Sequence, residues 1–186
     1  MSILFVAAVE FELDTARKAW ADRPATFLCG GVGSDATVQA LEATLAHGSY
    51  ERVVDIGIAG SYRDSLPLGA VVHVTAERHG DSGGTLLRQP SPWPEIAFLP
   101  TATGNTLQEL DDRYRQVEAD VETMEGAAFF EVCLRHGVPF AEIRAVSNRV
   151  GERNHAHWDI PLALRELEST LCRLKTILFP EQSLSS

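Results

Sequence analysis

The sequence predicts an α/β fold in which helices flank a central, mostly parallel or mixed sheet and so make three layers. Short apolar runs typical of buried strands alternate with stretches whose apolar residues recur at helical spacing. Glycine-rich or polar segments follow several of these strands, and ligands of such sheets bind beyond the carboxyl ends of strands. We expect the 186 residues to form one domain over 1–186, with a loose tail over 180–186.

Composition argues against several classes of function. A formal net charge of −10 disfavours nucleic acid or an anionic membrane as a partner, and the apolar runs stay below the ~18–20 residues of a membrane span. The start, MSILFVAAVEFE, lacks a basic flank and is expected to be a core strand rather than a signal peptide. Cys29, Cys133 and Cys172 lie among apolar neighbours without metal-ligand spacing, which predicts buried free thiols and a cytoplasmic protein.

The first strand is expected over residues 2–9, where a near-continuous apolar run is typical of a strand covered on both faces. Two acids, Glu10 and Glu12, follow it directly. If strand geometry persists to this point, both point to the same side of the sheet at its carboxyl end. A short helix to about residue 20 comes next.

A glycine-rich loop, Gly30-Gly31-Val32-Gly33-Ser34, joins a strand over residues 26–29 to a helix over 34–46. Glycines let the backbone approach a ligand at a helix N-terminus, and Ser34 is expected to cap the helix. A dinucleotide-binding loop is disfavoured because the loop follows the second strand and lacks the full G-x-G-x-x-G pattern. A tight turn into the helix is the other interpretation.

The later elements follow the same alternation. Gly137 and Pro139 stop a helix that begins at Met124, and Asp159 is expected to cap the closing helix. Residues 78–94 are expected to be a Gly/Pro/Ser-rich loop with one short strand. We expect strands over residues 51–59, 68–77, 85–87, 96–103, 117–122 and 140–147, and helices over 107–116, 124–136 and 161–178.

Candidate site residues lie where these strands end and one helix begins. Glu125 opens the helix at 124, and Asn148 ends the strand that follows it, so the two are expected to face one pocket. Small residues at the end of the third strand, Ala59 and Gly60, leave room for a flat ligand against the backbone.

Four segments resemble the nucleoside phosphorylase/hydrolase family: AAVEFE, GGVGSDA, DIGIAGS and VETMEGAAF. Within it the methylthioadenosine/S-adenosylhomocysteine nucleosidases are similar, and the futalosine hydrolases are more so. The latter resemblance rests on Met124–Phe130, Ser147-Asn148, Arg153-Asn154 and Trp158-Asp159-Ile160. It implies release of hypoxanthine from futalosine in a bacterial menaquinone pathway, by a homodimer that uses no metal and no organic cofactor.

The resemblance also implies roles for residues. Glu12 would activate water, Glu125 would bind ribose hydroxyls with Met124 packed on the sugar, and Asn148 would address the N7/O6 edge of the purine. Ala59 and Gly60 would lie near the base. Elementary chemistry agrees, because N-glycoside hydrolysis passes through a cationic sugar that carboxylates stabilise and needs a carboxylate to hold the attacking water.

Asn148 bears on the choice of base. Adenine-releasing relatives carry Asp there, whereas an Asn amide offers both a donor and an acceptor and can donate to a 6-oxo group, which favours hypoxanthine. An amide is a poor general acid, so protonation of the leaving base stays open. Phosphorylases of the family place Arg where this chain has Asp55, and a buried acid would repel phosphate, which favours water as the nucleophile.

Two alternative functions stay open. One is an adenine-releasing nucleosidase. The other, suggested by the short segment between Glu77 and Ile96, is a non-catalytic nucleoside-binding homologue.

Plainer interpretations exist for single residues. Glu12 is also what a helix N-terminus favours, Glu122 resembles a solvated strand-end acid, and Met124 resembles core packing. Asn148 also fits a turn. The pair His155 and His157 is expected to be solvated rather than to bind metal.

Overall fold

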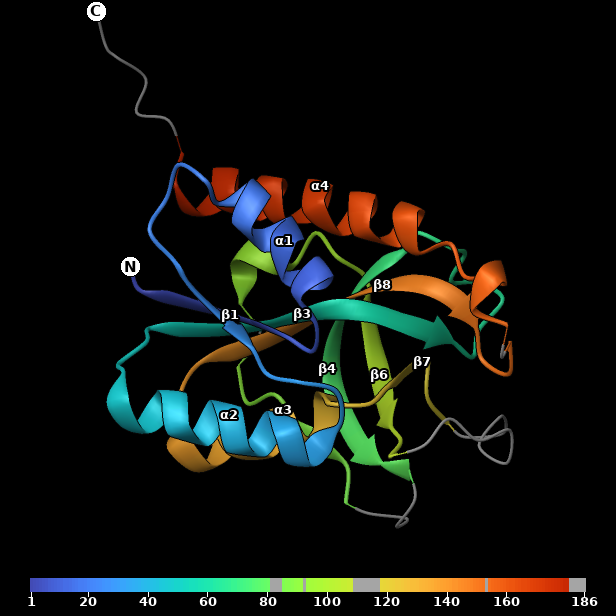
Figure 1. The fold of residues 1–186 in the computed structure, drawn as a ribbon, viewed down its shortest axis with the longest axis horizontal. Coiled ribbons are helices and arrows are strands. Elements are labelled where there is room, and N and C mark those ends of the chain that lie inside the picture. Colours follow the sequence, from blue (N-terminus) through green and yellow to red (C-terminus); the bar gives the residue numbers. More distant parts are fainter. Residues whose placement is uncertain (81–84, 92, 109–117, 153, 181–186) are drawn as a thin grey trace, which may run out of the picture.

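The computed structural model of the chain describes residues 1–80, 85–91, 93–108, 118–152 and 154–180. Over these residues eight strands form one sheet, with α1 and α4 on one face and α2 and α3 on the other (Figure 1). The strands are β1 (Ile3–Ala7), β2 (Thr26–Cys29), β3 (Arg52–Ser61), β4 (Val71–His79), β5 (Leu87–Arg88), β6 (Thr101–Thr106), β7 (Val121–Thr123) and β8 (Phe140–Arg149). The helices are α1 (Glu10–Ala19), α2 (Ser34–His47), α3 (Gly126–His136) and α4 (Ile160–Leu178). The predicted three-layer α/β class is confirmed.

The sheet is mixed, and part of it closes on itself. Strand β1 lies between β2 and β3, and β3 continues to β8, all in parallel. Strand β8 pairs antiparallel with β4, β4 and β7 pair parallel with β6, and β7 pairs antiparallel with the end of β3. The pairing therefore runs around a ring of β3, β7, β6, β4 and β8. Because β1, β3 and β8 are parallel, their carboxyl ends meet at one edge.

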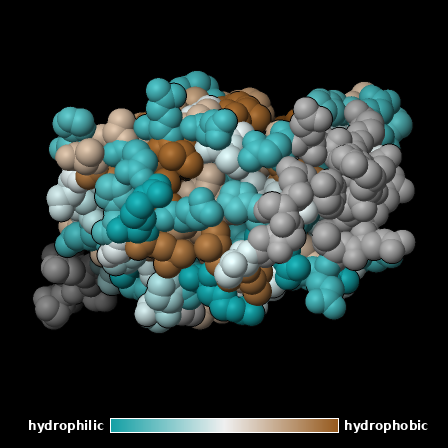
Figure 2. Space-filling model, turned by 90° about the horizontal axis from the view of Figure 1, so that it is seen from below, coloured by the Kyte–Doolittle hydropathy of each residue, from teal (hydrophilic) through white to brown (hydrophobic). Residues whose placement is uncertain are grey.

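The core lies on both faces of the sheet. In β1, Ile3 and Phe5 belong to a buried cluster with side chains of α1 and α4, whereas Leu4 and Val6 belong to a second cluster with side chains of α2 and α3. This confirms the prediction that the first strand is covered on both sides. The outer surface over α2 and α3 is mostly hydrophilic, with hydrophobic residues in smaller patches (Figure 2).

The expectation that Glu10 and Glu12 share one side is wrong. The strand ends at Ala7, and both acids lie in the first turn of α1, where residues two apart point in nearly opposite directions. Glu12 is 4% exposed. Glu10 is exposed and accepts a hydrogen bond from Arg17.

One of the two expected helix caps is present. The Asp159 carboxylate accepts from the N–H of Leu162 at 3.0 Å, which confirms the cap of α4. The prediction for Ser34 is wrong, because Gly33 occupies the capping position and Ser34 is the first helical residue. The Ser34 hydroxyl instead donates to the carbonyl of Met124.

Several boundaries differ from the expected ones. The strand expected over 96–103 is a 3₁₀ turn at Pro94–Ile96 followed by β6, and the short strand expected at 85–87 is β5. The strand expected from residue 68 begins only at Val71, after Gly69 takes a positive φ of 81°. The expected helix over 107–116 and the tail lie largely outside the described residues.

The prediction of buried thiols is right only for Cys133. Cys29 is exposed because it ends the edge strand β2, and Cys172 is exposed in a groove between α1 and α4. All three thiols are free. In the described part of the chain, no helix is long and apolar enough to cross a membrane.

Candidate active site

A cavity of about 400 Å³ lies at the edge where β1, β3 and β8 end. Its wall combines the turn between β1 and α1, the end of β3, the segment from β7 into α3, and the end of β8. Parallel pairing brings these ends together although they are far apart in sequence. All six predicted site residues line this cavity: Glu12, Ala59, Gly60, Met124, Glu125 and Asn148.

The Glu12 carboxylate is fixed through one of its two oxygens. Oε1 accepts from the N–H of Ile58 at 2.9 Å, whereas Oε2 is buried and finds no partner within the described part of the chain. Burial raises the pKa of Glu12, the Ile58 N–H and Arg144 lower it, and Glu125 raises it further. A buried carboxylate with a raised pKa and one open oxygen is suited to accept a proton from water.

Arg144 lies near Glu12, although no ion pair joins the two in the described part of the chain, and sequence reasoning missed this neighbour. A Cβ added at Gly57 would lie 2.3 Å from Arg144 Nη1 and 2.9 Å from Glu12 Oε1, so both groups use the space that glycine leaves. Arg144 is 1% exposed and forms ion pairs with Asp55 and with Glu142. The available signal was charged residues within the apolar patterns of β3 and β8.

The ion pair also corrects the argument from Asp55. This carboxylate is buried, as assumed, but Arg144 compensates its charge. Asp55 therefore does not act as a bare anion that repels phosphate.

The glycine-rich loop holds Glu125. The N–H of Gly33 donates to Glu125 Oε1 at 2.8 Å, and Gly33 has a φ of 91° that other residues rarely adopt. Glu125 is 8% exposed and occupies the position that precedes α3. Of the two interpretations of the loop, the structure favours the tight turn, and the turn positions a carboxylate.

The amide of Asn148 is oriented by its neighbours. Ser147 Oγ donates to Asn148 Oδ1 at 2.8 Å, and Asn148 Nδ2 donates to the carbonyl of Arg149 at 3.0 Å. A Cβ at Gly60 would lie 3.2 Å from Nδ2, so the amide lies against the end of β3. One N–H and one acceptor position of this amide have no bond among these contacts. Ser147, which the sequence analysis named in a motif but gave no role, bonds to the amide and orients it.

Hydrophobic side chains surround the mouth of the cavity. The Trp158 ring contacts that of His155, with ring centroids 4.2 Å apart and the planes tilted by 38°, and its Nε1 donates to the carbonyl of Glu152. Phe11 and Val32 also line the cavity, and both are exposed by about half (46% and 56%). An apolar mouth above acidic walls fits a ligand with one apolar and one polar end.

The structure contradicts the sequence-based interpretation of Glu122 and agrees with that of the His155 and His157 pair. Glu122 is 8% exposed and accepts a hydrogen bond from Tyr62, so its interpretation as a solvated strand-end acid is wrong. His155 and His157 are exposed, and His157 contacts the Glu152 carboxylate at 3.0 Å. The described residues contain no group of three or more potential ligands that could hold a metal ion.

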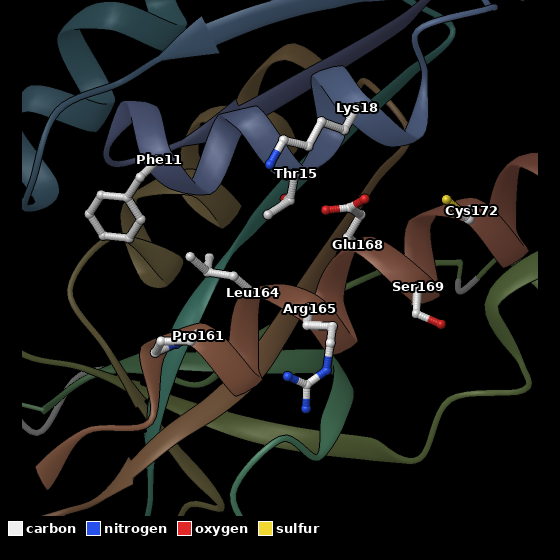
Figure 3. Close-up of a pocket in the computed structure, with 9 residues that line it drawn as sticks. All are labelled: Phe11, Thr15, Lys18, Pro161, Leu164, Arg165, Glu168, Ser169 and Cys172. Atoms are coloured by element: carbon white, nitrogen blue, oxygen red, sulfur yellow. The ribbon is translucent and has the colours of Figure 1, made fainter.

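A second hollow, a groove of about 460 Å³, lies between α1 and α4 (Figure 3). Arg165 is directed away from α1, so the charged side chains Lys18, Arg165 and Glu168 do not converge there. None of the predicted site residues lines the groove. The cavity at the strand ends is therefore the candidate active site.

Comparison with known proteins agrees with this geometry. Residues 96–178 match the model of the phosphorylase superfamily. The sequence is 31% identical to the futalosine hydrolase of Thermus thermophilus, in an alignment that covers 80% of this chain and 80% of the relative. It is also 31% identical to the futalosine hydrolase of Streptomyces coelicolor, with 69% of this chain and 67% of the relative covered. A methylthioadenosine/S-adenosylhomocysteine nucleosidase of Shewanella oneidensis is 25% identical over 69% of this chain and 68% of the relative.

Solved structures share the fold. A methylthioadenosine/S-adenosylhomocysteine nucleosidase of Colwellia psychrerythraea, in complex with adenine, superposes with a TM-score of 0.83 over 96% of both chains at 16% identity. The futalosine hydrolase of Helicobacter pylori gives a TM-score of 0.83 over 96% of this chain and 97% of that one at 12% identity.

Proposed function

Because the chain belongs to the futalosine hydrolase family of the phosphorylase superfamily, we propose that it is an N-glycosyl hydrolase that cleaves futalosine and releases hypoxanthine. The observation that carries the proposal is the convergence of Glu12, Glu125 and Asn148 on one cavity. Each of the three has the chemistry for one part of the reaction, namely the water, the sugar and the base.

Glu12 is the proposed general base. Its Oε1 is fixed by the Ile58 N–H, which leaves Oε2 to accept a proton from a water aimed at C1′ of the ribose. Because burial raises the pKa of this carboxyl, its ionised form is a stronger base than an exposed glutamate. Such proton transfer contributes roughly 10²–10⁴-fold to rate.

Glu125 is proposed to bind the ribose hydroxyls and to stabilise the cationic sugar of the transition state. The Gly33 N–H fixes Oε1 of Glu125 and so restrains the whole carboxylate. Oε2 is the oxygen proposed to accept from the ribose hydroxyls. Fixed charge in a water-poor site stabilises developing opposite charge without reorganisation. Met124, the neighbouring wall residue, is proposed to pack on the sugar.

Asn148 is proposed to recognise the purine. Its remaining N–H would donate to the 6-oxo or N7 edge of hypoxanthine, while the flat strand end at Ala59 and Gly60 supports the base. Adenine presents an amine where hypoxanthine presents an oxygen, so an amide held with this orientation discriminates between them.

An adenine-releasing nucleosidase is the second candidate. It is favoured by the relatives at 25% identity and by a structural neighbour that holds adenine. The identity to futalosine hydrolases is higher, and the residue at the purine edge is Asn rather than Asp, so futalosine is the preferred substrate. A nucleoside-binding protein without turnover is the remaining alternative.

The cellular setting is also part of the proposal. Release of hypoxanthine from futalosine implies a step in menaquinone synthesis, and the free thiols agree with a cytoplasmic location. We expect a homodimer, which sedimentation velocity tests. A single species at the 20.3 kDa of one chain would remove this expectation.

The experiment that tests the function is a product assay. The purified protein is incubated with futalosine, aminofutalosine, methylthioadenosine and inosine, and free base is followed by chromatography. Hypoxanthine from futalosine alone supports the proposal, and adenine from methylthioadenosine or aminofutalosine supports the second candidate. Binding of hypoxanthine without turnover of any of the four would indicate a binding protein.

A further inference from the structure

A buried network of charged residues lies beneath the cavity, beyond the residues assigned above. Asp55 on β3, Glu77 on β4, and Glu142 and Arg144 on β8 are each no more than 2% exposed. Burial of three carboxyl groups and one guanidinium is unfavourable for every charge that is not compensated, so such a network persists only when each member is paired or neutral.

Arg144 is the centre of the network. Its Nε donates to Glu142 Oε1 at 2.7 Å and its Nη2 to the carboxylate of Asp55, while Nη1 lies beside Glu12 in the space left by Gly57. One guanidinium thus bridges two buried acids and lies near the proposed catalytic base.

Glu77 completes the network from β4. Its carboxyl accepts from the hydroxyls of Thr106 and Thr123, and a Cβ at Gly126 would lie 2.3 Å from Glu77 Oε1 and 2.8 Å from Glu142 Oε1. Burial and then the neighbouring Glu142 raise the pKa of Glu77 well above its ordinary value. Asp55 and Glu142 form ion pairs with Arg144, whereas in the described part of the chain Glu77 forms none with it.

We propose that Asp55 and Glu142 are positioning residues of the hydrolytic step, which hold Arg144 beside Glu12 and compensate its charge so that Glu12 stays a competent base. The inference rests on the proposed role of Glu12. Without this compensation, a full positive charge beside Glu12 would stabilise its ionised form and weaken it as a base.

The charged groups around Glu12 come from several elements. Arg144 acts from β8, Asp55 from β3, and Glu125 from the start of α3. The charged residues of α4 nearest to α1, Arg165 and Glu168, line the separate groove and not the cavity that holds Glu12. Removal of the Asp55 carboxylate should therefore lower the pKa of Glu12, whereas removal of Arg144 should raise it.

The test measures the pKa of Glu12 in three variants, which are Asp55→Asn, Glu142→Gln and Arg144→Met. Two readouts are used. The first readout is the acid limb of the pH profile of kcat/KM for futalosine. The second is ¹³C NMR of the side-chain carboxyl of Glu12 in the ligand-free protein, assigned with Glu12→Gln. Glu77→Gln is the matched control, because Glu77 is as buried as Asp55 and Glu142 but, among the described residues, forms no ion pair with Arg144.

Asp55→Asn and Glu142→Gln are expected to move both readouts to lower pH by about one unit, and Arg144→Met is expected to move them to higher pH. Glu77→Gln should move neither. The proposal would be overturned if the variants lost kcat equally while the pKa of Glu12 stayed unchanged. It would also be overturned if Asp55→Asn and Arg144→Met moved the pKa of Glu12 in the same direction. If the wild type releases no base, the proposed function fails, but the NMR titration of Glu12 still tests the network. If Asp55→Asn does not fold, Glu142→Gln tests the network in its place.

Discussion

The backbone N–H of Gly33 donates a hydrogen bond of 2.8 Å to Oε1 of Glu125, 92 residues further along the chain. The bond joins the loop before α2 to the residue that precedes α3. It fixes one oxygen of the proposed sugar-binding carboxylate by means of a backbone conformation that only glycine readily adopts. The glycine-rich loop therefore serves the site through a carboxylate side chain.

Gly33→Ala should weaken both stability and substrate binding. A Cβ at Gly33 meets nothing within 4 Å, so the cost is the strained φ of 91°, about 1–3 kcal/mol in the free energy of unfolding. Rotation of the backbone to relieve this strain turns the N–H away from Glu125, and loss of that bond should raise the KM for futalosine about tenfold, as expected for about 1.5 kcal/mol from a bond to a charged group.

Gly30→Ala is the control for this prediction. A Cβ at Gly30 would make ordinary contacts, the nearest at 3.7 Å, and Gly30 has no positive φ. It should change the free energy of unfolding by less than about 0.5 kcal/mol. Equal effects of the two variants in urea unfolding and steady-state kinetics would contradict the role of Gly33.

Asn148→Asp should shift the preference of the enzyme from the 6-oxo base toward adenine. The carboxylate cannot donate to the 6-oxo group, but it can accept from the exocyclic amine of adenine. The ratio of kcat/KM for futalosine to that for aminofutalosine is expected to fall by about 10–100-fold, because a buried polar group is left unpaired with the wrong base. An unchanged ratio would count against this role of Asn148.

Ser147→Ala should reduce the same ratio by a smaller factor. The hydroxyl of Ser147 holds Asn148 Oδ1 at 2.8 Å, so its loss frees the amide to rotate. Since the amide is still present, we expect a loss of about 0.5–1.5 kcal/mol, which is roughly 2–10-fold in the ratio. Measurement of both substrates separates this from a general loss of activity, which would lower both rates equally.

Glu77→Gln should change how stability depends on pH. The pKa of Glu77 is raised in the folded state, so its contribution to the free energy of unfolding is present below its ordinary value of 4.5 and is lost as pH rises through the folded pKa. The wild type should therefore lose stability toward alkaline pH more steeply than the variant, as urea unfolding at several pH values would show.

Glu51→Gln is the control for Glu77. This carboxylate lies at the surface, and the N–H of Ser2 lowers its pKa, so its removal should not flatten the alkaline decline. Parallel stability curves for the wild type and Glu77→Gln would show that Glu77 is ionised alike in the folded and unfolded states.

The sequence predicted the layers, most elements and the six cavity residues, because these depend on local periodicity and short motifs. Details that depend on pairings across the fold were missed. The bond of Ile58 to Glu12 and the bridge from Arg144 to Asp55 join strands and helices that no local pattern connects. The antiparallel return of β7 onto β3, which closes the ring, is equally non-local.

Two local predictions failed for physical reasons. The chain turns from β1 into α1 earlier than the apolar pattern indicates, so Glu10 faces solvent and Glu12 faces the cavity. Gly33 adopts a conformation that takes over the cap position, which leaves the Ser34 hydroxyl to bond to Met124. Strand–helix boundaries and cap positions depend on single backbone angles, to which periodicity is insensitive.

The central claim, that Glu12 directs water to the C1′ atom of futalosine, is tested most directly by isotope transfer. Futalosine is treated with the wild type or Glu12→Gln in H₂¹⁸O that contains phosphate, and the sugar product is analysed by mass spectrometry. We predict hypoxanthine together with a free sugar that carries one ¹⁸O, at a rate roughly 10²–10⁴-fold lower in Glu12→Gln. A sugar 1-phosphate without ¹⁸O, or an undiminished rate in Glu12→Gln, would contradict the account.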